Sequence, residues 1–214
     1  IFTVVFEPDD FVLGVFIVIA ILTMISGALG VINKRNIRRI LSYFIVCHIG
    51  YLIAGIGLYT ELAFVGVVFY LIHDVIVKSN FFMMNGLIQK IRESQDIYRL
   101  GGFYKDYPKL SIVFAVILFS LAGIPPLSGF WPKIMLFQEA IKQESYVLLG
   151  TLIFASFITL FIVARIWSEV FWKDLPKPNS EEIDHFASFH KTGQWALVVP
   201  VVGLATISLL IGFK

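Results

Sequence analysis

The chain of 214 residues is 58% hydrophobic and 15% charged, with a mean hydropathy of +0.85. Soluble domains usually carry about 25% charged residues, so this composition excludes an ordinary soluble domain. The formal net charge of +2 indicates no particular partner, and we expect no nucleic-acid partner. The single cysteine, Cys47, excludes a disulfide framework and a cysteine-based metal cluster.

Six apolar stretches are long enough to cross a bilayer, which takes about 20 residues per helix. In chain order, the predicted spans are Phe11–Ile32, Ile37–Leu58, Leu62–Ile88, Leu110–Ile141, Tyr146–Trp172 and Trp195–Phe213. The polar connections 89–109 and 173–194 leave no room for a soluble domain. The sequence therefore predicts an all-α, multi-pass membrane protein in which residues 1–214 form a single transmembrane domain. We interpret the chain as a fragment, because it begins with Ile1 and shows no signal peptide.

Basic residues are unevenly divided between the two sides of the predicted membrane. The first, third and fifth connections hold twelve of them: Lys34, Arg35, Arg38, Arg39, Lys90, Arg92, Arg99, Lys105, Lys109, Lys173, Lys177 and Lys191. The opposite side holds only Lys142 and Lys214. Because cytoplasmic loops carry an excess of lysine and arginine, we expect these three connections to lie in the cytoplasm, and the protein to lie in the inner (plasma) membrane.

The fourth span is interrupted by a segment rich in proline and glycine. Its sequence, LAGIPPLSGFWPK, contains Gly123, Pro125, Pro126, Gly129 and Pro132. Proline removes a backbone donor and clashes with the preceding turn, so we expect a broken helix, with Pro132 extending the break up to the following lysine. Such breaks are tolerated in membranes only where protein or water satisfies the backbone, and they are typical of ion pathways in transporters.

Lys133 follows the break directly. A lysine at membrane depth is costly in lipid, so we expect its side chain to face the protein interior and to be functional.

The third span carries a cluster of polar residues in the sequence YLIHDVIVKSNFFMMNG. Asp74 and Lys78 are four residues apart, so they share a helical face and are expected to form an ion pair. His73 adjoins them, and His48 lies about midway along the second span. Each histidine alone is also compatible with a structural hydrogen bond between helices. Protonatable groups at this depth are typical of proton relays, so we predict one path through His48, His73, Asp74, Lys78 and Lys133.

Arg165 and Glu169 are secondary candidates near the end of the fifth span. Their spacing of four residues places them on one helical face, where they can form a pair or reach the membrane interface. The position of Arg165 is compatible both with an anchoring role and with a functional one.

Three motifs of the chain resemble one family, the antiporter-like subunits of respiratory complex I and of the multisubunit Mrp sodium/proton antiporters. The first motif is KRNIRRILSYFIVCHIGYLIAGIGLY. The second, IHDVIVKSNFFMMNG, is similar to the family's next helix, and the third, LAGIPPLSGFWPK, is similar to its second broken helix. The resemblance covers nearly the whole chain. It implies the C-terminal six helices of a fourteen-helix subunit.

The resemblance also implies a function. Lysines and histidines of the family form a proton route at mid-membrane depth, and other subunits of a membrane complex are the partners. The context of Lys133 is most similar to the D subunits of the Mrp antiporters, in which proton entry is coupled to sodium export. Asp74 departs from the family pattern, where a second histidine or a glycine is common. It is expected to hold Lys78 in its charged form.

Three functional classes stay open at this point. The first is a secondary antiporter subunit, and the second is a pumping subunit of NADH:quinone oxidoreductase or of a membrane-bound hydrogenase. The third is a scaffold that carries no protons. The sequence has no nucleotide-binding motif and no Cys/His metal spacing. We therefore expect no cofactor and, for the antiporter, no enzymatic reaction.

Overall fold

The computed structural model describes residues 8–174 and 191–213, with the side chains of 191–197 left out. Lys177 and Lys214, which entered the prediction of membrane orientation, lie outside the described residues. Within the described part, all regular elements are helices, and one isolated bridge pairs Asn36 with Asp96. The predicted all-α class is confirmed.

Four helical segments in the described part are long and apolar enough to cross a membrane. They are α1 (Asp10–Ile32), α2 (Ile37–Leu58), α3 (Glu61–Arg92) and the continuous segment Tyr146–Trp172, in which α7 (Tyr146–Trp167) runs into a π-helical turn, η1 (Ser168–Trp172). The other elements are α4 (Phe103–Asp106), α5 (Pro108–Ala122), α6 (Phe130–Lys142) and α9 (Lys191–Gly212). These bounds follow the predicted spans, except that α3 ends later, α9 begins earlier and the short α4 was not predicted.

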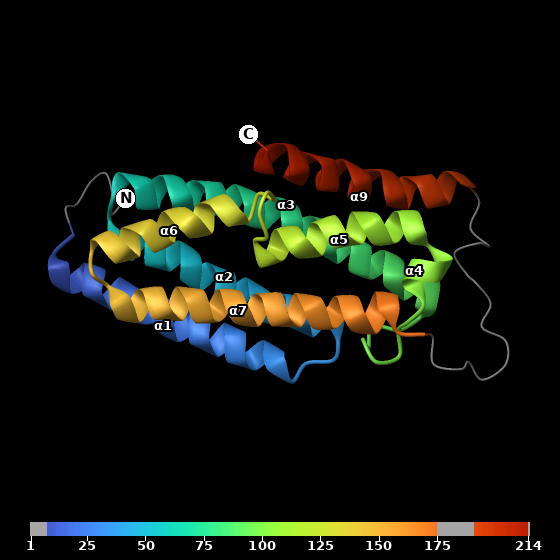
Figure 1. Cartoon of the computed structure of the whole chain (residues 1–214), viewed down its shortest axis with the longest axis horizontal. Coiled ribbons are helices and arrows are strands. Elements are labelled where there is room, and N and C mark those ends of the chain that lie inside the picture. Colours follow the sequence, from blue (N-terminus) through green and yellow to red (C-terminus); the bar gives the residue numbers. More distant parts are fainter. Residues whose placement is uncertain (1–7, 175–190, 214) are drawn as a thin grey trace.

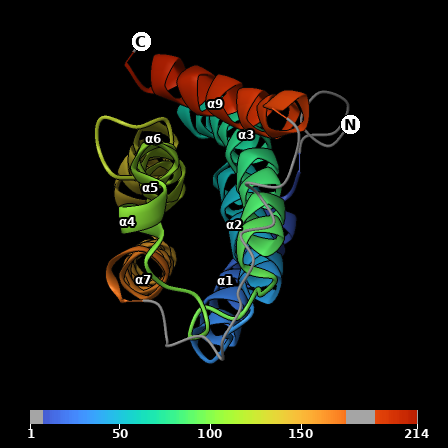
Figure 2. The same ribbon diagram turned by 90° about the vertical axis from the view of Figure 1, so that its right-hand side faces the viewer.

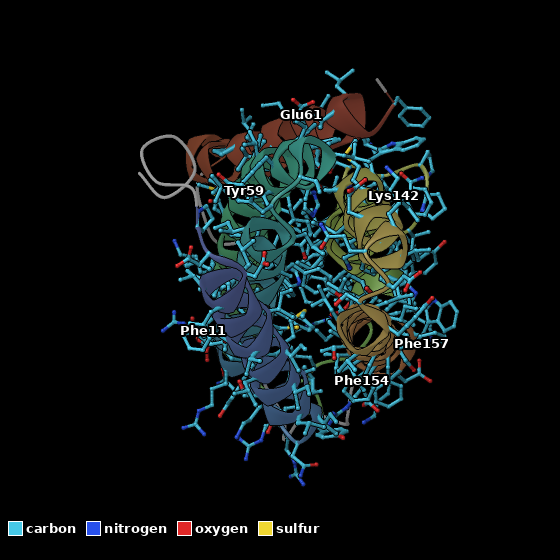
Figure 3. All side chains as sticks on the ribbon, turned by 90° about the vertical axis from the view of Figure 1, so that its left-hand side faces the viewer. Phe11, Tyr59, Glu61, Lys142, Phe154 and Phe157 are labelled. Carbon is cyan, nitrogen blue, oxygen red and sulfur yellow. The ribbon has the colours of Figure 1, made fainter. Side chains whose placement is uncertain are left out.

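The helices form two layers, with α1, α2 and α3 in one and α4 to α7 in the other (Figures 1 and 2). Helix α9 crosses one edge of both layers and contacts α3 and α5. Between the layers, Phe81 of α3 meets Phe114 of α5 edge to face, with ring centroids 6.2 Å apart. Phe11 and Phe157 lie on opposite outer faces and are exposed (Figure 3). Helices that are apolar on both faces are typical of a membrane-embedded bundle.

The predicted break separates α5 from α6. Helix α5 ends at Ala122 and α6 begins at Phe130, so residues 123–129 form the interruption. Gly123 follows α5 with a φ of 80°, a left-handed conformation that glycine adopts without strain. The predicted extension of the break through Pro132 is wrong, because Pro132 lies in the first turn of α6. The amides of a first turn have no partner within the helix, so proline is tolerated there.

Backbone hydrogen bonds join the three basic connections at one end of the bundle. The amide of Ile97 donates to the carbonyl oxygen of Arg35 at 3.0 Å, which links the connection after α3 to the connection after α1. The amide of Gly102 donates to the carbonyl oxygen of Lys173 at 2.7 Å, which links it to the end of η1. These three connections therefore lie on the same side, as alternating spans require.

Gly27 of α1 lies directly against the backbone of α2. A Cβ added at Gly27 would lie 2.5 Å from the backbone nitrogen of Cys47. Gly27→Ala should therefore push the two helices apart and lower the thermal unfolding midpoint in detergent, since overpacking costs about 1–3 kcal/mol. Gly14→Ala in the same helix is the matched control, because nothing lies within 4 Å of its added Cβ. Equal midpoints for the two variants would contradict this packing.

Candidate functional site

Asp74 of α3 is the centre of a buried group of ionisable side chains. Its Oδ1 accepts a hydrogen bond from His48 Nδ1 and its Oδ2 accepts one from Lys78 Nζ, each at 2.6 Å. Lys78 lies one turn along α3, whereas His48 comes from α2. His48 and Lys78 are buried, and the Asp74 side chain is 14% exposed. The predicted pair of Asp74 and Lys78 is present, and His48 joins it.

The contact with Asp74 assigns the tautomer of a neutral His48. An ionised carboxylate only accepts hydrogen bonds, so His48 Nδ1 carries the hydrogen. Nε2 then presents a free lone pair, and it has no hydrogen-bond partner among the described residues. A histidine held in this way can take up a proton at Nε2 while Asp74 stabilises the resulting positive charge.

Tyr70 lies between the two histidines of the predicted path. Its ring centroid is 5.5 Å from that of His48 and 5.9 Å from that of His73. The Tyr70 hydroxyl is buried and, like Nε2 of each histidine, has no hydrogen-bond partner in the part of the chain that the structure describes. Because buried polar groups are nearly always satisfied by protein or by ordered water, three such atoms on adjacent side chains favour a hydrated contact here.

His73 forms a hydrogen bond with the helix break and not with Asp74. Its Nδ1 forms a hydrogen bond of 2.8 Å with Ser128 Oγ. Ser128 Oγ lies 3.0 Å from both Ser120 Oγ of α5 and Ser208 Oγ of α9, and the latter two are 2.9 Å apart. These three buried hydroxyls, called the serine triad below, form a closed triangle around which α3, α5, α9 and the break meet.

Lys133 of α6 reaches back across the break. Its Nζ donates to the carbonyl oxygen of Ala122, the last residue of α5, at 3.0 Å. Because the C-terminal end of a helix carries partial negative charge, α5 stabilises the ammonium group. The side chain is buried, and Nζ lies 5.5 Å from the ring centroid of Tyr51. Lys133 thus faces the protein interior.

The structure divides the predicted path into two groups. His48, Asp74 and Lys78 are joined directly. His73 and Lys133 each bond to the break region, and within residues 8–174 and 191–213 no hydrogen bond connects them to the first group. The rings of Tyr51 and Tyr70 lie between the groups, stacked with centroids 5.3 Å apart.

Arg165 and Glu169 lie outside both groups. Arg165 donates to the carbonyl oxygen of Ile32 at 2.7 Å and to the hydroxyl of Tyr98 at 2.6 Å. Glu169 accepts a hydrogen bond of 3.0 Å from Lys173 rather than pairing with Arg165. The contacts of Arg165 fasten α7 to the end of α1 and to the connection after α3, so they favour the anchoring role.

The serine triad and the position of Tyr70 between the two histidines were not predicted from the sequence. Ser120 and Ser128 flank the break in the sequence, which was the available signal, but Ser208 lies 80 residues beyond Ser128. No group of three His, Cys, Asp or Glu residues that could hold a metal ion occurs in the described part of the chain.

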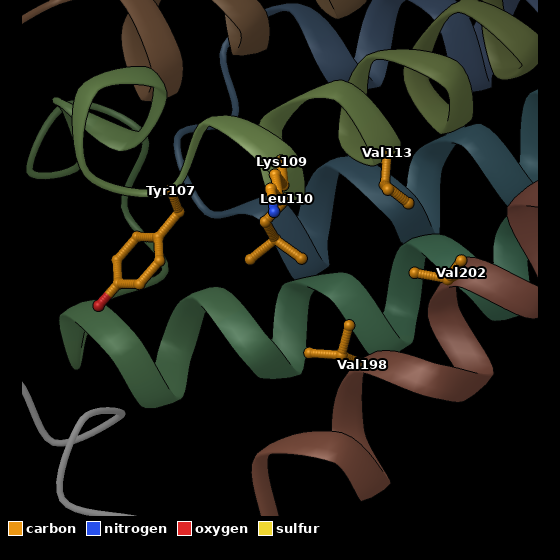
Figure 4. Close-up of a pocket in the computed structure, with 6 residues that line it drawn as sticks. All are labelled: Tyr107, Lys109, Leu110, Val113, Val198 and Val202. Atoms are coloured by element: carbon orange, nitrogen blue, oxygen red, sulfur yellow. The ribbon is translucent and has the colours of Figure 1, made fainter. Parts of the chain in front are cut away.

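A groove of about 320 Å³ between α5 and α9 is separate from these groups (Figure 4). Apolar side chains make up most of its wall, with Tyr107 and Lys109 toward one end; the others are Leu110, Val113, Val198 and Val202. None of the residues of the predicted path lines it.

The family model described as "NADH:quinone oxidoreductase/Mrp antiporter, TM" matches residues 1–159. The chain belongs to this family. Within the NADH:quinone oxidoreductase/Mrp antiporter family, it is 36% identical over 213 residues to the Na(+)/H(+) antiporter D subunit of Alkalihalophilus pseudofirmus. It is 32% identical over 216 residues to the protein of the same name from Bacillus subtilis. Each alignment covers 99% of this chain and 42% of the relative, so the chain spans less than half the length of these relatives.

Solved structures of the family have the same arrangement of helices. A chain of the Mrp complex from Dietzia sp. DQ12-45-1b matches with a TM-score of 0.86 and 26% identity, over 99% of this chain and 46% of that chain. A chain of respiratory complex I from Thermus thermophilus with bound NADH matches with a TM-score of 0.79 and 18% identity, over 94% and 40%, which concerns the fold alone. Family membership and the apolar helices together identify a multi-pass membrane protein.

Asp74→Asn should destabilise the protein, because it leaves Lys78 without its buried counter-charge. Breaking a buried ion pair costs about 3–5 kcal/mol. The double variant Asp74→Asn, Lys78→Met should recover a large part of this loss, since neither charge remains. Thermal unfolding in detergent measures both. Asp174→Asn is the control, because its pair with Lys105 is exposed and should contribute little. A double variant less stable than Asp74→Asn alone would refute this account.

Proposed function

We propose that this chain is the proton-conducting part of a subunit of a multisubunit antiporter that exchanges sodium ions for protons. Its family and its similarity to D subunits of Na(+)/H(+) antiporters support the proposal. In this proposal, residues 1–214 form one transmembrane domain in the inner (plasma) membrane, and the partners are the other membrane subunits of the complex. The three basic connections face the cytoplasm.

The observation that carries the proposal is the buried sequence of contacts from Lys78 through Asp74 to His48. An unpaired charge at the centre of a membrane costs about 2.5 kcal/mol or more, so a relay there needs charge balance. With Asp74 ionised, the net charge of the three side chains is zero whether the transferable proton lies on Lys78 or on His48 Nε2. A proton can therefore move between these two sites without leaving an uncompensated charge in the membrane.

Tyr70 extends the path from His48 toward the break. Its hydroxyl both donates and accepts hydrogen bonds, and its ring lies 5.5 Å from the ring of His48 and 5.9 Å from the ring of His73. Neither Nε2 atom of these histidines has a hydrogen-bond partner among the described residues. Water molecules between these atoms would complete the connection, since proton transfer needs contacts of hydrogen-bond length or a single bridging water.

Lys133 is the second cationic site of the proposed path. The end of α5 compensates its charge, so a proton can be held there without a carboxylate. Lys133 lies just after the break, and irregular backbone at membrane depth is found where it is buried in protein or lines a water-filled cavity.

Lys78→Ala should lower sodium-dependent proton exchange more than tenfold, because a positioned proton-transfer group contributes about 10²–10⁴-fold. The measurement is dissipation of a proton gradient in everted membrane vesicles that hold the full-length protein in its complex. Lys109→Ala is the matched control, since Lys109 is exposed at the start of α5. Wild-type exchange in Lys78→Ala vesicles with normal assembly would make Lys78 structural. Co-purification with quinone-reducing subunits, instead of antiporter subunits, would replace the proposal by that of a redox-driven pump.

A pair of tyrosine variants separates transfer from stability. Tyr70→Phe removes a hydroxyl that has no hydrogen-bond partner among the described residues, so we expect slower exchange with no loss of thermal stability. Tyr51→Phe removes a hydroxyl that donates to Leu152 O at 2.7 Å and lies 2.7 Å from Ser156 Oγ, so it should lower stability by about 1–2 kcal/mol and leave exchange by the assembled protein intact. The same outcome for both variants would remove Tyr70 from the path.

A further inference from the structure

The serine triad sits where the break, α9 and His73 are in closest contact. A Cβ added at Gly129 would lie 2.2 Å from the carbonyl oxygen of Ser120 and 2.9 Å from the His73 ring, so glycine is needed for this approach. A Cβ added at Gly212 would lie 2.7 Å from the backbone nitrogen of Ser128. Trp131 Nε1 donates to the carbonyl oxygen of Gly212 at 2.9 Å, which holds the end of α9 against α6.

The number of hydrogens available in the serine triad determines the preferred tautomer of His73. Three hydroxyls supply three hydrogens, which satisfy the three sides of the triangle when each serine donates once and accepts once. The Ser128 hydrogen is then used inside the triad, and its second lone pair accepts the hydrogen of His73 Nδ1. The opposite arrangement, in which Ser128 donates to His73, leaves one side of the triangle without a hydrogen. The first arrangement therefore has one more hydrogen bond.

We propose that the serine triad is a positioning site that holds His73 with its hydrogen on Nδ1. Nε2 is thereby kept as a proton acceptor, on a ring whose centroid lies 5.9 Å from that of Tyr70. The tautomer of His73 also depends on the position of α9, because Ser208 supplies one of the three hydroxyls of the triad. The role in transport rests on the proposed function, whereas the control of His73 by the triad does not.

The charged and titratable groups around His73 come from several elements. Asp74, Lys78 and Tyr70 share α3 with it, His48 faces it from α2, and Lys133 faces it from α6. From α5 and from residues 198–212 of α9, the groups that reach it are the hydroxyls of the triad. Variants of the triad therefore change the surroundings of His73 without removing a charge.

The test is hydrogen–deuterium exchange at the C2 position of the His73 ring, followed by mass spectrometry across a pH series in the full-length protein. The midpoint pH of this exchange reports protonation of the imidazole ring. In Ser128→Ala, the midpoint should move down by about one pH unit, because the protonated ring loses a charge-assisted hydrogen bond, which is stronger than the hydrogen bond that the neutral ring loses. Ser208→Ala should move it less and in the same direction, since the contact with Ser128 remains. Ser128→Thr, which keeps the hydroxyl, should restore the wild-type midpoint.

Ser111→Ala is the matched control. Ser111 is a buried serine of α5, as is Ser120 of the triad. Its hydroxyl donates to the carbonyl oxygens of Phe103 and Tyr107, near the start of α5, and not to the triad. An unchanged midpoint in Ser128→Ala, or an equal shift in Ser111→Ala, would overturn the proposal. If Ser128→Ala fails to assemble, an unshifted midpoint in Ser208→Ala overturns it instead.

Transport measured on the same variants separates this inference from the proposed function. We expect the pH profile of sodium-dependent exchange to move with the His73 midpoint in the triad variants. The wild-type protein could show no sodium-dependent exchange while the triad variants still shift the His73 midpoint. That result would refute the proposed function and support the control of His73 by the triad. Normal wild-type exchange with no midpoint shift in any triad variant would refute the triad alone.

Discussion

The backbone groups freed between α5 and α6 must find partners inside the protein, because hydrocarbon offers none. The structure meets this constraint locally and from neighbouring helices. The amide of Gly123 donates to the carbonyl oxygens of Phe119 and Ser120 at 3.0 and 3.1 Å, and Lys133 covers the carbonyl oxygen of Ala122. Lys133 of α6 is thereby held at the break, where His73 of α3 and Ser208 of α9 also bond to Ser128. The break therefore determines where polar side chains of α3, α6 and α9 gather.

Asp74 imposes a second constraint, because one carboxylate serves two basic side chains. Its ionised form fixes the hydrogen of His48 on Nδ1 and neutralises Lys78 at the same time. Aromatic rings, rather than further carboxylates, separate this group from Lys133. Charge is thus balanced by an acid in α3 and by a helix end at the break, two physically different devices that lie on either side of Tyr51 and Tyr70.

Features that depend on local sequence could be predicted well. Span positions followed from apolar length, and the pairing of Asp74 with Lys78 followed from a helical spacing of four. The prediction for Pro132 was wrong because proline is typical both of a helix break and of the first turn of the helix that follows, so the sequence alone does not separate the two positions. Contacts between distant segments carried no such signal. His48 meets Asp74 across 26 residues and Ser120 meets Ser208 across 88, so both depend on how helices pack.

The hydrogen-bonded connections at one end of the bundle have a mechanical consequence. Backbone bonds from Ile97 to Arg35 and from Gly102 to Lys173 tie both layers together there. At the opposite end, Gln143 Nε2 donates to the carbonyl oxygen of Leu58 at 2.5 Å, and a side-chain hydrogen bond joins Glu139 of α6 to Thr60 at the start of α3. Separating the layers would therefore break backbone hydrogen bonds at one end and side-chain hydrogen bonds at the other.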